Sequence, residues 1–338
     1  MLLLVHVVVY LCGMFPQIKI QTGALAIGLV LMAVKVLAWW LTKSDAILTD
    51  ALESIVNIVA GAFGLYSLVL ASKPRDLDHP YGHGKIEFVA AGLEGGLIFF
   101  AGTVILWKSA YGFLYPHPLA SLGWGLWLTG LTGGINYLIG WRMSRYGRQH
   151  DSMVLISGGS HLKSDAYSSV GILAGLGLLL LTGWQWVDSA TAMIFGFVIL
   201  YHGWQIIRES MAGIMDEADQ ELITSLALHL ELHRQNEWID VHNLRIIKYG
   251  NTFHIDCHLT LPWYLNLQDA HAAVKTFEKT ADSFATKPVE LFVHSDPCEA
   301  HSCEICQISD CPVRQRVALA RTTWTPENII ANRMHSVS

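Results

Sequence analysis

Residues 46–70 read AILTDALESIVNIVAGAFGLYSLVL, an apolar run with acidic and amide side chains in its first half. The run is longer than the about 20 residues that a helix needs to cross a hydrocarbon core. Within it, Asp50, Glu53 and Asn57 are spaced i, i+3 and i+7, which places them along one helix face. The stretch therefore predicts a membrane-spanning helix with one polar face.

The composition of the whole chain also indicates a membrane protein. Of its 338 residues, 52% are hydrophobic and 15% are charged, and the mean hydropathy is +0.37. An ordinary soluble domain has about 25% charged residues. The apolar residues are concentrated between Gly23 and Tyr201, whereas the sequence after Asp216 is typical of a soluble domain.

These contrasts predict four segments along the chain. They are an N-terminal apolar segment of unassigned role at 1–21, a six-helix transmembrane domain at 22–211, a cytoplasmic α/β domain at 212–297, and a Cys-rich and polar tail at 298–338. We expect poor order toward the end of the tail.

Six stretches are long and apolar enough to span a bilayer. They are Thr22–Leu41, Ala46–Leu70, Ile86–Tyr111, Leu122–Trp141, Gly158–Thr182 and Val187–Ile207. Lys and Arg residues gather in the loops on one side of these spans, which marks that side as cytoplasmic. These residues are Lys73, Arg75, Lys85, Arg142, Arg145, Arg148 and Arg208. We therefore expect a multi-pass protein of the cell membrane with both termini in the cytoplasm.

The segment after the last span predicts a small α+β domain. A helical pattern covers Asp216 to about Gln235, and two strands at Val241–Tyr249 and Thr252–Leu261 flank a Gly-Asn turn. A helix near Gln268–Phe284 and a strand at Val289–His294 follow. The order α-β-β-α-β is that of small metallochaperone-like domains.

Two predicted spans carry residues that suit a divalent metal. Glu53 and Asn57, with Asp50 one turn away, share a face of the second span, and His161 and Asp165 share a face of the fifth. Charged groups in a bilayer are costly and need compensation. Facing each other, the two sets supply four or five nitrogen and oxygen ligands of the kind that zinc takes. The alternatives are a proton site, or polar residues that tie helices together by hydrogen bonds.

Two further groups contain metal-ligand residue types. Asp76, His79 and His83 lie in the loop after the second span, where glycines allow tight turning; the alternative is a solvated loop. In the tail, Cys298, Cys303, Cys306 and Cys311 suit Zn²⁺, Cu⁺ or an iron–sulfur cluster, with zinc preferred. The alternative there is four reduced thiols without a ligand.

Three motifs together resemble those of the cation diffusion facilitator family. They are SDAILTDALESIVN at 44–57, HPYGHGK at 79–85 and HLKSD at 161–165, and the resemblance extends over roughly Ala24 to Cys298. It implies a homodimer that moves Zn²⁺, or Fe²⁺, Co²⁺, Cd²⁺ or Mn²⁺, out of the cytoplasm in exchange for protons. It also implies a transport site made of Glu53, Asn57, His161 and Asp165, although relatives commonly place Asp or His at the first of these positions and Asp at the second.

The same resemblance assigns roles outside the spans. Lys85 and Asp216 match a pair that links the membrane and cytoplasmic parts of the two subunits. A set of residues in the cytoplasmic domain matches positions that hold a two-zinc regulatory site in some relatives, namely His242, His258, His271, His294 and Asp296. Solvated histidines are the alternative for that set.

Several function classes are excluded or disfavoured by the sequence. The net charge of −6, without a basic stripe, argues against nucleic-acid binding, and no Gly-rich phosphate loop indicates nucleotide use. The chain lacks the His-Glu-x-x-His helix of a metalloprotease, so we predict that it is not an enzyme. A metal-sensing receptor and an uncoupled channel remain as alternatives to an exporter.

Overall fold

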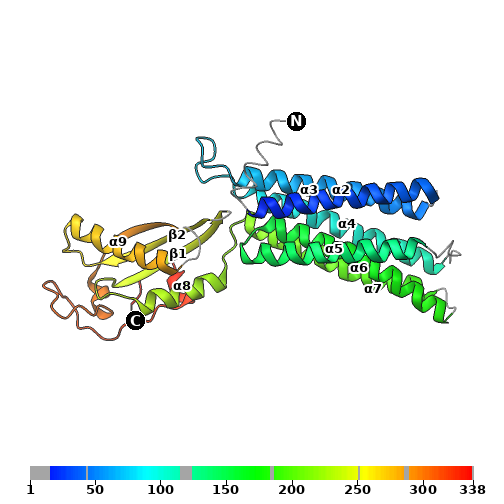
Figure 1. The fold of residues 1–338 in the computed structure, drawn as a ribbon. Helices are drawn as coiled ribbons and strands as arrows, with labels where there is room; N and C mark the ends of the chain where they lie inside the picture. Colours follow the sequence, from blue (N-terminus) through cyan, green and yellow to red (C-terminus); the bar gives the residue numbers. More distant parts are fainter. Residues whose placement is uncertain are drawn as a thin grey trace. The chain divides into compact units, whose positions relative to one another are not determined.

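The chain folds as two compact units that divide between Met215 and Asp216. A computed structural model describes residues 16–42, 45–114, 124–182, 186–249, 252–284 and 289–336. Figure 1 shows a bundle of long helices in the first unit and a small sheet with helices in the second.

The first unit contains six long helices among its described residues. They are α2 (Pro16–Thr42), α3 (Asp45–Ala71), α4 (Ile86–Leu114), α5 (Trp124–Gln149), α6 (Met153–Thr182) and α7 (Trp186–Ile214). Most extend beyond the predicted apolar spans because a helix can continue into polar residues at its ends. The start of α2 at Pro16 moves part of the predicted N-terminal segment into the first helix, and proline is well suited to a first helical position.

Close helix packing in the first unit depends on small residues. The helices pair chiefly as α4 with α7, α5 with α6, and α2 with α3. A Cβ added to Gly140 would lie 2.6 Å from the carbonyl oxygen of Gly159, and a Cβ on Gly159 would meet Gly140 at the same distance. These two glycines therefore allow backbone contact between α5 and α6, as is common between membrane helices.

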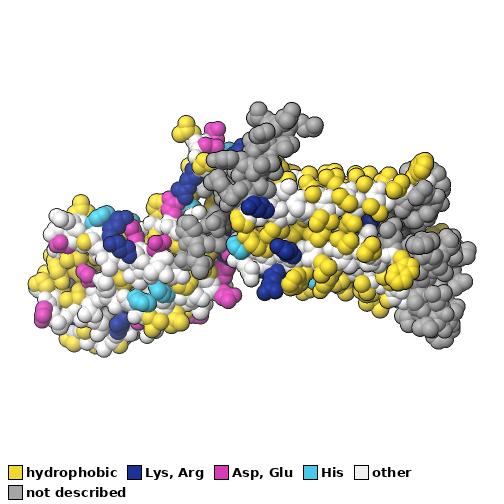
Figure 2. Space-filling model, viewed as in Figure 1, with side chains coloured by type: hydrophobic (Ala, Val, Ile, Leu, Met, Phe, Trp, Pro, Cys, Tyr) yellow, Lys and Arg dark blue, Asp and Glu magenta, His cyan; other side chains and the backbone are white. Residues whose placement is uncertain are grey.

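The face of the helical unit seen in Figure 2 is largely apolar. Large side chains stand exposed on several helices, including Val59, Phe100, Leu138 and Phe197, each at least 60% exposed. Soluble monomers rarely expose contiguous apolar areas of this extent, so the surface suits a lipid environment. Among the described residues, Pro16–Leu37 and Ile86–Leu114 are apolar and long enough by themselves to cross a membrane.

The second unit is built around a three-stranded sheet. Its elements are α8 (Gln220–Leu232), β1 (Asp240–Tyr249), β2 (Thr252–Leu261), α9 (Leu267–Phe284), β3 (Val289–Pro297), the short 3₁₀ turn η1 (Ala300–Glu304) and α10 (Pro326–Ile329). Strand β2 lies in the centre, antiparallel to β1 and parallel to β3. Alternate residues of β2, including Ile255 and Leu259, enter the core with Phe277 of α9.

The tail after β3 packs against this unit, contrary to the expected poor order. Trp324 and Ile329 belong to the main core, and the Trp324 ring stacks on the Arg234 guanidinium at 3.9 Å. The carbonyl of Ala331 accepts a hydrogen bond from the Asn243 backbone at 2.8 Å. These separate anchors hold a segment that has little regular secondary structure of its own.

Candidate metal centre

Three predicted ligands from α3 and α6 meet inside the helical unit. His161 Nε2 donates to Asn57 Oδ1, and Asn57 Nδ2 donates to Asp165 Oδ2, both at 2.7 Å. His161 Nε2 also lies 3.9 Å from Asp165 Oδ2. Two ligand atoms that share a tetrahedral zinc ion are about 3.4 Å apart, so a small movement would bring this pair to coordinating distance.

The other two predicted ligands of this site lie outside the described side chains. The backbone of Glu53 and of Asp50 belongs to α3, one turn and two turns before Asn57, respectively. Their participation stays a prediction.

A cavity of about 70 Å³ adjoins Asn57 and His161. Its polar lining also includes Gln21, Lys35, Ser54, Glu94 and Asn136. Glu94 is 3% exposed and accepts a hydrogen bond from Ser157, and Lys35 donates to Ser54 Oγ at 3.0 Å. The sequence places Glu94 inside a span, but only the packing of α4 against α6 shows that it shares a cavity with the α3–α6 ligands.

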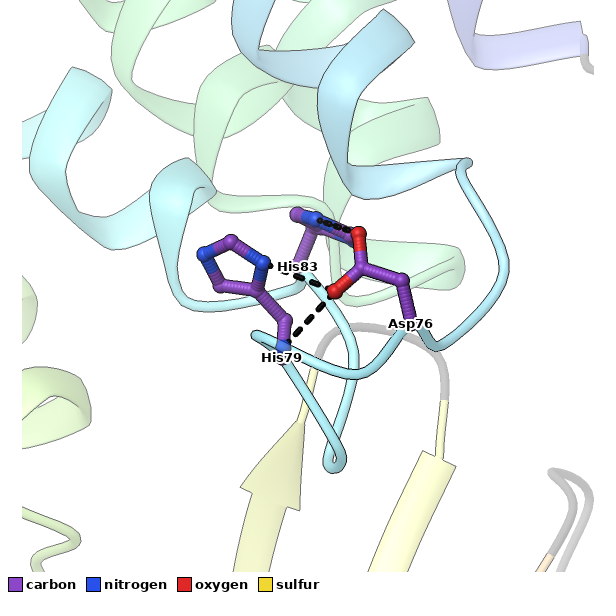
Figure 3. Close-up of side chains that lie close together, drawn as sticks. All are labelled: Asp76, His79 and His83. Atoms are coloured by element: carbon purple, nitrogen blue, oxygen red, sulfur yellow. Dashed lines mark hydrogen bonds and ion pairs between the residues drawn. The ribbon is translucent and has the colours of Figure 1, made fainter.

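The loop between α3 and α4 gathers Asp76, His79 and His83, as Figure 3 shows. Asp76 Oδ1 accepts from the His79 backbone at 2.7 Å and lies 3.0 Å from His79 Nδ1, while His83 Nε2 lies 3.4 Å from Asp76 Oδ2. Gly82 adopts a φ of +93°, a conformation that permits the turn between the two histidines. The sequence therefore correctly predicted that these three side chains converge.

The charge of the Asp76 carboxylate is favoured by its neighbours. Desolvation acts to raise its pKa, but the hydrogen bonds from His79 and the two nearby imidazoles hold that pKa below its ordinary value. An ionised carboxylate beside two imidazoles is a ligand set that divalent transition metals accept.

The cytoplasmic sheet brings a third group together through its strand register. His242 of β1 pairs with His258 of β2, and His258 pairs with His294 of β3, so the three imidazoles form a row across the sheet. Asp296 lies two residues along β3, with its Oδ2 2.9 Å from His258 Nδ1 and 3.3 Å from His242 Nε2. His294 Nε2 lies 3.2 Å from Asp296 Oδ1.

The predicted fifth member of this group is placed elsewhere. The compact metal-ligand group contains His242, His258 and Asp296, and His271 lies exposed near the start of α9.

The buried carboxylate of Asp240, which the sequence did not indicate as a site residue, lies next to His242 of this group. Asp240 is 1% exposed, and its Oδ2 lies 3.5 Å from His242 Nδ1. Burial acts to raise the pKa of Asp240, but hydrogen bonds from His242 and His335 keep that pKa below its ordinary value. The same carboxylate raises the pKa of His335 in the tail. Asp240 thus links the tail to the metal-ligand group of the sheet, as carboxylates commonly do behind ligating histidines.

The remaining predicted residues lie near the ends of the two units. Lys85 donates to the Ile214 carbonyl at 3.4 Å, within the helical unit. Asp216 opens the second unit, so its pairing with Lys85 stays a prediction. The four tail cysteines line one cavity in the second unit.

Comparison with known families agrees with both units. Residues 22–215 match the cation efflux transmembrane domain, and residues 219–298 match the cytoplasmic domain of cation efflux proteins. The first match alone covers more than half of the chain. The second supports assembly as a homodimer, and together the two matches identify a membrane protein.

Individual relatives match along most of their length. An uncharacterised transporter of Synechocystis is 32% identical over 84% of this chain and 90% of its own. The manganese efflux system protein MneS of Bacillus subtilis is 28% identical over 77% and 90%, and the cation-efflux pump FieF of Shewanella oneidensis is 26% identical over 82% and 93%. The family consists of transporters and not of enzymes. The chain belongs to the cation diffusion facilitator family of divalent metal cation efflux transporters.

Proposed function

We propose that this chain exports a divalent transition metal, with Zn²⁺ as the first candidate, in exchange for protons and by alternating access. The observation that carries the proposal is the contact of Asn57 with His161 and Asp165 between α3 and α6. An imidazole and a carboxylate at 3.9 Å are ligands that zinc accepts. Fe²⁺, Co²⁺, Cd²⁺ and Mn²⁺ are further candidates, and one relative is named for manganese efflux.

The ligand chemistry supports coupling to protons. Imidazole and carboxylate groups bind a metal only when they are deprotonated, so metal and protons compete for the same atoms. A histidine exchanges its proton near neutral pH unless its surroundings shift it strongly. Proton entry from the outside would therefore promote release of the metal there.

The arrangement in the membrane forms part of the proposal. We assign all six helices α2–α7 as spans and place both termini in the cytoplasm, because the Lys and Arg residues gather in the loops of that side. The loop group Asp76, His79 and His83 would then meet cytoplasmic metal first. The row of imidazoles on the sheet, with Asp296, would bind zinc as a regulatory ligand.

The test is metal flux in vesicles that contain the purified protein, with and without a pH gradient. His161→Ala and Asp165→Ala should each abolish flux while leaving expression and dimerisation intact, since each removes a ligand. His150→Ala is the matched control, because His150 is exposed at the end of α5 and stacks on Tyr146 instead of facing the site. Flux that survives both site substitutions would show that the assigned site is wrong.

The same assay separates the exporter from the alternatives. A receptor would give no flux, and an uncoupled channel would give flux that is insensitive to the pH gradient. A panel of divalent ions in the same vesicles would identify the cargo.

A further inference from the structure

The tail after β3 carries a cysteine cluster that the family relationship does not explain. The match to the cytoplasmic domain ends at residue 298, so Cys303, Cys306 and Cys311 lie beyond it. Yet the tail is packed and anchored through Trp324 and Ile329. A structured extension with clustered thiols requires its own account.

All four tail cysteines line one cavity of about 70 Å³. Cys298 directly follows β3, and its backbone N–H donates to the Leu261 carbonyl at 2.9 Å. Cys303 lies in η1, and Cys306 is 5% exposed in a small cluster with Ile239 and Ile305. The structure therefore brings together cysteines from the end of a strand, a 3₁₀ turn and the loop that follows.

The loop that carries the cysteines is held largely by hydrogen bonds to its backbone. The guanidinium of Arg314 donates to the carbonyls of Cys303 at 3.1 Å, Cys306 at 3.4 Å and Ile308. Glu299 and Ser302 cap η1 reciprocally, and none of the four cysteines forms a disulfide. The loop thus has a defined backbone, and a positive charge lies next to the thiols.

We propose that Cys298, Cys303, Cys306 and Cys311 bind one Zn²⁺ ion as a four-thiolate site that fastens the tail to the cytoplasmic unit. The spacings are C-x4-C, C-x2-C and C-x4-C, each within the range of two to four residues between paired zinc ligands. Four thiolates around a divalent ion leave two negative charges, which the Arg314 guanidinium in the cavity wall partly offsets. Soft sulfur ligands also distinguish this site from the nitrogen and oxygen ligands of the other groups.

Metal binding would contract the loop. Among the described residues, the compact metal-ligand groups are those around Asp76 and Asp296. No three of the four tail sulfur atoms therefore lie within 4.8 Å of one another. Sulfur atoms that share a tetrahedral zinc ion are about 3.8 Å apart. Three of the four cysteines are only half-buried, so an ion can reach them and draw them inward.

The test uses the full-length protein, purified under reducing conditions and analysed for bound metal. The double variant Cys303→Ser with Cys306→Ser should hold about one zinc equivalent less per chain than the wild type. It should also lose the thiolate-to-Co²⁺ charge-transfer absorption after cobalt replacement. Cys257→Ala, which changes a buried thiol in the sheet core, should keep both. Equal zinc in the wild type and the double variant, or iron with sulfide in the wild type, would overturn the proposal.

A second measurement on the wild type guards against a folding defect in the variant. After removal of metal by a chelator, added Zn²⁺ should protect the four tail thiols from alkylation, as counted by mass spectrometry of their peptides. Alkylation at equal rates with and without Zn²⁺ would refute the site. Neither experiment reads transport, so a failure here would leave the proposed export function untouched.

Discussion

The amide of Asn57 bridges His161 and Asp165 of α6, and its replacement by a carboxylate gives the sharpest test of the proposed transport site. In the structure Asn57 Nδ2 donates to Asp165 Oδ2 at 2.7 Å, and its Oδ1 accepts from His161. Asn57→Asp keeps the size of the side chain but removes the amide donor. In the empty site, two carboxylates would then face each other at hydrogen-bond distance.

The size of the effect follows from that distance. Two unit charges about 3 Å apart repel by about 5 to 6 kcal/mol at an effective dielectric constant of about 20. This corresponds to a factor of about 10⁴ against the doubly ionised pair. The variant would therefore hold one additional proton between the two carboxylates when empty, and a bound divalent ion would displace it.

Two assays follow the substitution. Proton release on metal binding, measured from the dependence of the binding heat on the buffer, should rise by about one proton per ion. Flux across a panel of divalent ions should shift toward zinc, because a carboxylate binds zinc more strongly than a neutral amide oxygen does.

The matched control is Asn136→Asp. Asn136 lines the same cavity from α5, so this variant also adds a carboxylate there but outside the contact of Asn57 with Asp165. It should leave proton release and selectivity near the values of the wild type. If Asn57→Asp changes neither quantity, or if both variants act alike, Asn57 is not a ligand.

Three other contacts yield predictions. His335→Gln should destabilise the cytoplasmic unit by about 1 to 3 kcal/mol at about pH 5.5. The pKa of His335 is raised and the pKa of Asp240 is lowered, so their contact contributes its full stability between the ordinary pKa values of 3.8 and 6.5. This stability is lost as the pH rises through the raised pKa of His335. A difference in unfolding free energy between wild type and variant, measured from denaturant curves, that grows toward alkaline pH would contradict this. Trp324→Ala should cost about 3 to 5 kcal/mol in the same assay, since it removes a core ring and uncovers Arg234. Asp76→Asn should raise the metal concentration for half-maximal flux without lowering the maximal rate; an unchanged half-saturation would refute a capture role.

Helical spacing was sufficient to predict which helix faces carry the polar residues of the proposed transport site. Asn57 lies in a run with i, i+3 and i+7 polar positions, and His161 and Asp165 are one turn apart. Such periodicity identifies a face but not its neighbours. The cavity shared with Glu94 and the hydrogen bond from Lys35 to Ser54 depend on which helices pack together, and no local pattern carries that information.

The cytoplasmic unit shows the same limit in another form. Local patterns predicted the strands that carry His258 and His294, but the register of the sheet is what aligns His258 with its neighbours on β1 and β3. The role of Asp240 and the docking of the tail could not be predicted. The tail is held by isolated contacts of residues such as Trp324 and His335, which form no periodic sequence pattern. Its polar composition alone therefore suggested poor order.

The ligand types of this chain fit two kinds of proposed metal site, a transport site that releases its ion and a structural site that retains it. A transport site must release its ion. The α3–α6 group offers an imidazole and a carboxylate, for which protons compete with the metal, and an amide that hydrogen-bonds to both. Four thiolates hold zinc far more firmly and contribute directly to folding. If the proposed tail site were part of the transport route, such firm binding would retain the transported ion. Firm binding suits instead a structural role, in which the metal holds the tail segment whose His335 contacts Asp240. Firm binding also predicts that brief chelation which empties the transport site leaves zinc in the tail.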